Sequence, residues 1–129
     1  WTQGLEQGRV AMTVARFGNL AICLAVVVHD GDTIRCNGEK VRIANIDAPE
    51  LAGSARCNGR HAGGRNPPWC DYPLGLRSRD ALIRYLAGGQ VRIWRSGTDR
   101  YGRTLARVTV NGRDAGAYLV SQGLARWWK

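Results

Sequence analysis

The feature that most constrains the fold is a series of closely spaced turn signals between residues 22 and 46. An apolar run rich in β-branched residues, 22–29, ends at Asp30-Gly31-Asp32, and Asn37-Gly38 marks a second tight turn. The segments 22–29, 33–37 and 41–46 are short and alternate with these turns, which favours strands over helices. The first part of the chain is therefore predicted to form an antiparallel, three-stranded meander.

Beyond the meander, hydrophobic periodicity and glycine-rich boundaries predict two helices and two further strands. These elements are a helix over 76–86, strands over 90–95 and 104–110, and a helix over 114–122. Residues 51–73, rich in glycine and proline, show no period and are expected to be irregular. This order lacks the strand–helix–strand alternation that builds a parallel sheet. It predicts a mainly β fold, a five-stranded OB-type barrel with two to three helices.

The chain length favours one globular domain. Its 129 residues, 44% of them hydrophobic, can build a single core. We assign that domain to residues 21–129 and interpret residues 1–20 as an arm, either loose or an added, non-native sequence. The apolar run 20–28 is far shorter than the about 20 residues that a membrane-spanning helix needs. We expect a monomer without a membrane partner.

The charge balance points to a polyanionic partner. The formal net charge is +9, and Lys40 and Lys129 are the only lysines, so arginine supplies nearly all of the basic residues. A guanidinium can bind phosphate through two parallel hydrogen bonds, which a lysine cannot do. The composition therefore favours nucleic acid as a partner, whereas a basic surface that only keeps the protein soluble is the alternative.

Four cysteines, Cys23, Cys36, Cys57 and Cys70, favour an oxidising, extracytoplasmic compartment because an even number can pair. A Cys57–Cys70 disulfide is favoured, since it would close a loop that has little core of its own. Free thiols are the second interpretation. A zinc site that includes His61 is the third, because these residues offer only three ligands.

A cluster of acidic residues is unexpected in so basic a chain. Four of the ten acids, Asp30, Asp32, Asp47 and Glu50, lie between positions 30 and 50. Asp32 begins the second predicted strand and Asp47 follows the third, so an antiparallel meander brings both carboxylates to one rim. Like charges held together favour a hard divalent cation between them. Asp30 is better explained as a turn residue.

Two arginine-bearing segments could contact a phosphate. Arg42 precedes Asp47 by five residues, and this odd spacing puts them on opposite faces of a regular strand. A bend before Asp47 would be needed to bring both to one site. In the loop 98–103, Arg100, Tyr101 and Arg103 could clamp a phosphate and stack a base, although an exposed loop with incidental charges would look the same.

Together, these segments resemble the staphylococcal (thermo)nuclease family over about residues 26–125. The matching stretches are Asp30-Gly31-Asp32-Thr33, Arg42 through Asp47-Ala48-Pro49-Glu50, Asp99-Arg100-Tyr101-Gly102-Arg103, and more weakly Leu119 through Gln122-Gly123-Leu124-Ala125. They occur in the family's order and at similar intervals. The segment 57–72 departs from the family's pattern and could narrow the groove that binds the substrate.

The resemblance implies an OB-type barrel that hydrolyses DNA and RNA with calcium. It assigns Asp32, Asp47 and the carbonyl of Ala48 to the metal, and Glu50 to the activation of the attacking water. The two arginines on the scissile phosphate would be Arg42 and Arg103.

By the same resemblance, Arg100 and Tyr101 would contact a terminal phosphate of the nucleotide. The alternative is a non-catalytic OB module that binds nucleic acid or a protein. Such a module would have no need of the complete set of acids and arginines.

Overall fold

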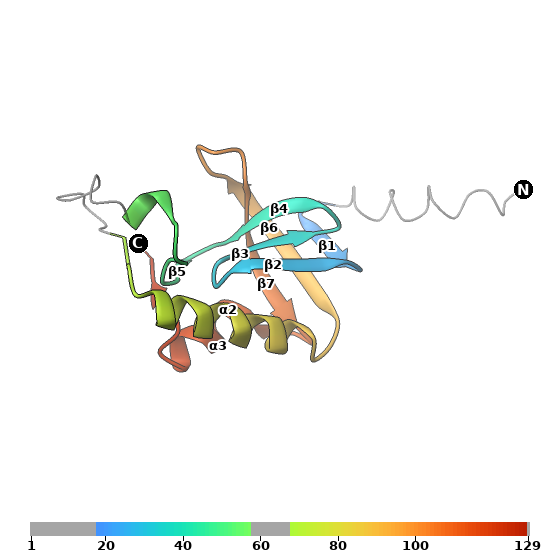
Figure 1. Ribbon diagram of the computed structural model, residues 1–129. Coiled ribbons are helices and arrows are strands. Elements are labelled where there is room, and N and C mark those ends of the chain that lie inside the picture. Colours follow the sequence, from blue (N-terminus) through green and yellow to red (C-terminus); the bar gives the residue numbers. More distant parts are fainter. Residues whose placement is uncertain (1–17, 58–67, 129) are drawn as a thin grey trace, which may run out of the picture.

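The computed structural model describes residues 18–57 and 68–128, and within them the fold is mainly β with two α-helices (Figure 1). The strands are β1 (Leu20–Cys23), β2 (Val26–Asp30), β3 (Thr33–Cys36), β4 (Glu39–Ile43), β5 (Ile46–Asp47), β6 (Val91–Thr98), β7 (Thr104–Val110), β8 (Arg113–Asp114) and β9 (Arg126–Trp127). The helices are the short 3-10 helix η2 (Ala55–Cys57), α2 (Tyr72–Leu86) and α3 (Ala115–Ser121). Residues 1–17 of the expected arm, and His61, lie outside the described residues.

The main sheet curls on itself, as an OB-type barrel requires. Its strands follow the order β1-β6-β7-β4-β3-β2, with β4 and β7 parallel. The two ends of this path, β1 and β2, are consecutive in the chain and are separated by only Leu24 and Ala25. The covalent chain between β1 and β2 therefore brings the two edges of the curled sheet close together. This confirms the mainly β, OB-type fold expected from the sequence.

The single strand predicted over 22–29 is wrong, because the chain breaks there into β1 and β2. The side-chain oxygen of Asn37 accepts hydrogen bonds from the amides of Leu24 (2.8 Å) and Ala25 (3.1 Å), and its amide group donates to the Ile22 carbonyl (2.9 Å). These bonds satisfy the backbone where pairing changes partner. As a result β1 pairs with β6 and β2 pairs with β3, which bends the wall of the barrel.

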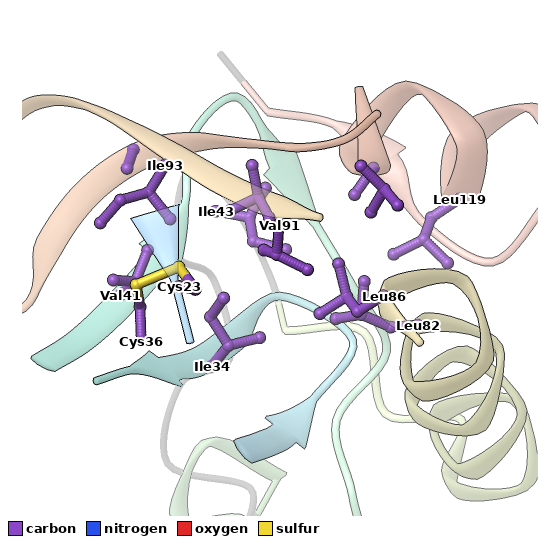
Figure 2. Close-up of a cluster of buried hydrophobic side chains, with 14 of the residues drawn as sticks. Cys23, Ile34, Cys36, Val41, Ile43, Leu82, Leu86, Val91, Ile93 and Leu119 are labelled. Carbon is purple, nitrogen blue, oxygen red and sulfur yellow. A yellow bond between two sulfur atoms is a disulfide. The ribbon is translucent and has the colours of Figure 1, made fainter. Parts of the chain in front are cut away.

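The barrel interior is a continuous apolar core that includes a disulfide. Figure 2 shows the Cys23–Cys36 bridge among buried side chains from the strands, with Leu82, Leu86 and Leu119 contributed by the helices. Cys23 and Cys36 are both buried, at 8% and 1% exposure. The bridge therefore ties the end of β1 to β3 from inside the core.

The two α-helices lie on the same side of the curled sheet (Figure 1). The α2 helix begins at Tyr72, four residues before the predicted start, because Asp71 caps it by accepting a hydrogen bond from the Leu74 amide (3.1 Å). It packs on α3 through Tyr85 and Tyr118, whose rings stack with centroids 4.2 Å apart. Among the described residues, no helix is both long and apolar enough to cross a membrane.

A partly exposed ion pair ties three strands together at Glu39. Its carboxylate accepts hydrogen bonds from Arg95 of β6 (2.7 and 2.9 Å) and from the Thr104 hydroxyl of β7 (2.6 Å). The Arg95 hydrogen bonds lower the pKa of Glu39, while partial burial opposes that shift. A carboxylate whose pKa is lowered by folding stabilises the native state above its unfolded pKa, and that contribution is lost as the pH falls.

We expect Glu39→Gln to lower the free energy of unfolding at pH 7 by about 1 kcal/mol, because the pair is partly exposed and therefore screened. Urea unfolding at pH 7 and at pH 3 would measure this. The difference from wild type should shrink at the lower pH, because protonation of Glu39 removes the contribution of its charge. An equal loss at both pH values would show that the charge of Glu39 contributes nothing.

Candidate active site

The turn before β3 and the end of β5 bring two buried carboxylates together. Asp32 is 7% exposed and Asp47 is fully buried. One oxygen of Asp32 accepts a hydrogen bond from the Ala48 amide (3.0 Å), and the other accepts one from the Thr33 hydroxyl (3.1 Å). Asp32, Asp47 and Ala48 therefore lie at one rim of the barrel.

A turn between β4 and β5 brings Arg42 to the same rim. The third strand, predicted over 41–46, ends instead at Ile43, and Asn45 takes a left-handed conformation with φ 72°. The chain then leaves β4, and the next strand pairs with β9. The Arg42 guanidinium consequently lies 3.6 Å from a carboxylate oxygen of Asp32 and 3.7 Å from one of Asp47.

The Arg42 side chain is held firmly in this position. One guanidinium nitrogen donates to the carbonyls of Ile43 (2.8 Å) and Ile46 (2.9 Å), which are the two carbonyls that flank the turn. The guanidinium also lies 5.8 Å from the ring centre of Trp128, near the end of the described chain. Its side chain is 12% exposed, so one edge of it can still meet a ligand.

Glu50 follows on the loop after β5, and both of its carboxylate oxygens are engaged. The Ser54 hydroxyl donates to one oxygen (2.6 Å) and an Arg56 nitrogen donates to the other (3.1 Å). The same Arg56 nitrogen lies 3.9 Å from Asp47. Arg56 therefore lies between Glu50 and Asp47.

Arg103 reaches the acids through one hydroxyl group. Its guanidinium donates to Asp99 (2.7 Å) and to the Thr33 hydroxyl (3.4 Å), which in turn donates to Asp32. Burial raises the pKa of Asp99, but the hydrogen bonds from Arg103 and from the Tyr101 amide together lower this pKa by a larger amount, so the net shift is downward. Asp99 thus stays ionised and keeps the loop folded around Arg103.

The other two loop residues lie farther from the acids. Tyr101 is 73% exposed, and its ring lies between the guanidinium groups of Arg100 (5.5 Å) and Arg103 (5.6 Å). The loop therefore brings Tyr101 beside Arg103. The contacts of Arg100 are with the tyrosine ring and not with Asp32 or Asp47.

Two arginines at the site were not predicted from the sequence. Arg126 is the direct strand partner of Asp47 in the β5–β9 pair, and its guanidinium donates to one Asp47 oxygen (2.7 and 2.9 Å). Arg56 lies in the segment 51–73 that was expected to be irregular. Arg126 carries no local signal, because the pairing of β5 with β9 joins residues far apart in the chain. Arg56 stands in a stretch without periodicity, so no pattern singles it out.

The acids at this rim are electrostatically strained. Burial, the negative charge of Asp32 and a weaker effect of Glu50 raise the pKa of Asp30 to about 7. Burial also raises the pKa of Asp47, opposed by the Arg126 hydrogen bond. Asp30 accepts a hydrogen bond from the Asp32 amide, as a turn residue does, but it also adds to the acidic cluster.

The donor set at this rim suits a hard divalent cation. The second oxygen of Asp47 is buried and receives no hydrogen bond from the residues that the structure describes, although Arg42 and Arg56 lie within ion-pair distance. Oxygen atoms of carboxylates and carbonyls are the ligands that calcium prefers. Within residues 18–57 and 68–128, no three acid, histidine or cysteine side chains converge into a complete metal cage. A cation here would therefore also need backbone or water ligands.

Comparison with known proteins agrees with this geometry. The chain is 32% identical over 112 residues to an "Uncharacterized endonuclease" of Haemophilus influenzae, covering 83% of this chain and 52% of the relative. It is 34% identical over 100 residues to "Succinoglycan biosynthesis protein ExoI" of Rhizobium meliloti, a match that covers 76% of this chain and 48% of the relative. It is also 34% identical over 113 residues to "Protein ParB" of Escherichia coli, a match that covers 78% of this chain and 53% of the relative.

The chain thus spans about half the length of the curated relatives that it matches. The family model "Staphylococcal nuclease homologue" matches residues 40–129, which include Arg42, Asp47, Glu50 and Arg103. This match covers most of the chain and confirms the resemblance inferred from the motifs. The chain belongs to the family of staphylococcal nuclease homologues.

Proposed function

We propose that this domain is a calcium-dependent phosphodiesterase that hydrolyses DNA, RNA or both. One observation carries the proposal: two buried carboxylates and Glu50 lie at one rim together with Arg42, and a single hydroxyl links that rim to Arg103. The name of the Haemophilus relative, an endonuclease, and the excess of arginine support the same function.

The residues proposed to hold calcium are Asp32, Asp47 and the carbonyl of Ala48. The buried Asp47 oxygen, which accepts no hydrogen bond from any described residue, and the all-oxygen donor set support that assignment. When bound, calcium would supply positive charge beside the phosphate and hold the reacting groups in place. It would also relieve the mutual repulsion of the clustered acids, which neighbouring arginines such as Arg42 now offset.

The remaining roles follow from charge and position. Hydrolysis of a phosphodiester builds negative charge on the oxygens of phosphorus, and Arg42 and Arg103 could each donate hydrogen bonds to them. Glu50 would accept a proton from the attacking water. Tyr101 and Arg100 would contact the nucleotide beyond the scissile phosphate, because the exposed tyrosine ring offers a stacking surface next to Arg103.

The first test is to incubate the purified protein with single-stranded DNA and single-stranded RNA in calcium. We expect cleavage that chelation with EDTA abolishes and that added calcium restores. Cleavage that persists in the chelator would exclude the metal. Binding without cleavage under every metal condition would instead support the alternative, a non-catalytic OB module.

Arg103→Ala is expected to lower kcat by about 100-fold or more with a smaller change in KM, because its hydrogen bond strengthens as charge develops on the phosphate. Steady-state kinetics on a short oligonucleotide would measure both constants. Arg107→Ala is the control: it removes the same charge from an exposed side chain of β7 whose ion-pair partner is Asp114 and not an acid of the rim. An unchanged kcat in Arg103→Ala would remove this residue from the reaction.

We also propose an extracytoplasmic location. The Cys23–Cys36 and Cys57–Cys70 disulfides support it, because such bonds form and persist in oxidising compartments.

A further inference from the structure

The carboxylate of Glu50 is held from both sides by the short segment that follows it. Ser54 donates to one oxygen at 2.6 Å and Arg56 donates to the other at 3.1 Å. The Glu50 side chain is only 13% exposed, so these contacts are shielded from solvent. A carboxylate bound at both oxygens cannot change its side-chain rotamer without losing at least one strong, charge-assisted hydrogen bond.

The backbone of this segment is folded so that Ser54 and Arg56 are presented together. The Ser54 hydroxyl accepts a hydrogen bond from the Arg56 amide (3.3 Å), and the Ser54 carbonyl accepts one from the Cys57 amide (3.1 Å). These bonds form the single turn of η2. Ser54 thus joins the Glu50 carboxylate directly to the turn that carries Arg56.

The segment is closed at its far end by a disulfide. Cys57 is bonded to Cys70, and the residue before Cys70, Trp69, accepts a hydrogen bond from the Glu50 amide at 2.8 Å. Glu50 and Cys57, at the two ends of this segment, are therefore both joined to the same short stretch, residues 69–70. This fixes the distance between Glu50 and η2 by one covalent and one hydrogen-bonded link.

We infer that Ser54 and Arg56, held by the Cys57–Cys70 disulfide, are positioning residues that orient the Glu50 carboxylate for catalysis. The inference rests on the proposed function, in which Glu50 accepts the proton of the attacking water. A base contributes fully only when it points at its proton, and a displacement of about 1 Å can cost about 100-fold in rate. Arg56 also contacts Asp47, so it fixes Glu50 relative to the proposed metal ligands.

Arg56→Ala should lower kcat by about 10- to 100-fold and change KM by less than about threefold. Arg56→Lys should recover part of kcat, because it keeps the charge, and Ser54→Ala should show a smaller loss. The control is Arg79→Ala: Arg79 has nearly the same side-chain exposure (35% against 38%) and is also ion-paired, but with Asp80 on α2. A loss confined to KM would mean that Arg56 binds substrate, and would overturn the inference.

The disulfide is tested by its interaction with Arg56. If the bridge acts by holding Arg56 on Glu50, Cys57→Ser/Cys70→Ser should lower kcat, yet should lower it little further in the Arg56→Ala background. Cys23→Ala/Cys36→Ala removes the other bridge, which also spans 13 residues, and should leave kcat unchanged in protein that is folded by circular dichroism. If the fold-loss of kcat in the combined variant equals the product of the losses from Arg56→Ala and from removal of the Cys57–Cys70 bridge, the bridge does not act through Arg56 and this part of the inference is refuted.

A second measurement separates this inference from the proposed function. A double-mutant cycle on unfolding free energy, with Glu50→Gln and Arg56→Ala, needs no catalysis, and a non-zero coupling is expected. The parallel cycle with Glu50→Gln and Arg79→Ala should give none. Coupling without any cleavage by wild type would refute the proposed function alone, whereas cleavage without coupling would refute the positioning role alone.

Discussion

Replacing Glu50 by glutamine is expected to lower the rate of nucleic-acid cleavage by about 100- to 10,000-fold, the range typical for loss of a general base. Glutamine has nearly the same shape and can still accept the hydrogen bond from Ser54, so the site should keep its form. It cannot take a proton from water at neutral pH. Single-turnover kinetics with saturating calcium would measure the chemical step directly.

Glu39→Gln is the matched control for this prediction. Glu39 also accepts hydrogen bonds from an arginine and from a hydroxyl group, but it lies on β4 with its partners on β6 and β7. The two variants make the same chemical change, and only the one at position 50 should lose kcat. Full activity in Glu50→Gln, with an unchanged melting temperature, would remove Glu50 from the mechanism.

The parts of the fold that could be predicted from the sequence are those fixed by local turn chemistry. Asn37-Gly38 forms the turn between β3 and β4, and both residues take positive φ values, as that dipeptide favours. The last long strand was predicted over 104–110, and β7 has those bounds. Short turns and alternating segments were enough for the OB-type barrel because each hairpin sets its own register.

The breaks in the predicted strands depend on contacts between distant residues. The break between β1 and β2 requires the Asn37 side chain to bond the backbone at positions 22, 24 and 25. The end of β4 at Ile43 depends on β5 pairing with β9, near the other end of the described chain. An apolar run continues through the first of these points, and the alternating segment 41–46 continues through the second, so the sequence pattern alone predicts an unbroken strand at each.

The same reason explains which residues of the site could be found. Asp32, Asp47 and Glu50 lie close together in sequence and in recognisable motifs, so their shared rim could be proposed from strand order. The approach of Arg42 could not, because it depends on the turn at Asn45. Arg126 contacts Asp47 only through the β5–β9 pair, and a lone arginine so far along the chain carries no local signal.

Arg42→Ala is expected to lower both stability and activity, because Arg42 is the cation shared by Asp32 and Asp47. Within the described part of the chain, its removal leaves the Asp32 carboxylate, which is 7% exposed, without an ion-paired guanidinium, and it frees the carbonyls of Ile43 and Ile46. Breaking a buried ion pair in this way typically costs about 3–5 kcal/mol of unfolding free energy. Urea unfolding at pH 7 would measure that loss.

Arg42→Lys separates the two roles of this residue. A lysine keeps a positive charge near the carboxylates but cannot bond both carbonyls and a phosphate in one plane. We therefore expect it to recover more of the stability than of the cleavage rate. Arg79→Ala, a surface control, should change the unfolding free energy by less than about 0.5 kcal/mol. If Arg42→Ala is as stable as that control, the acids at the rim do not need Arg42 as a counter-charge, and its role is confined to the phosphate.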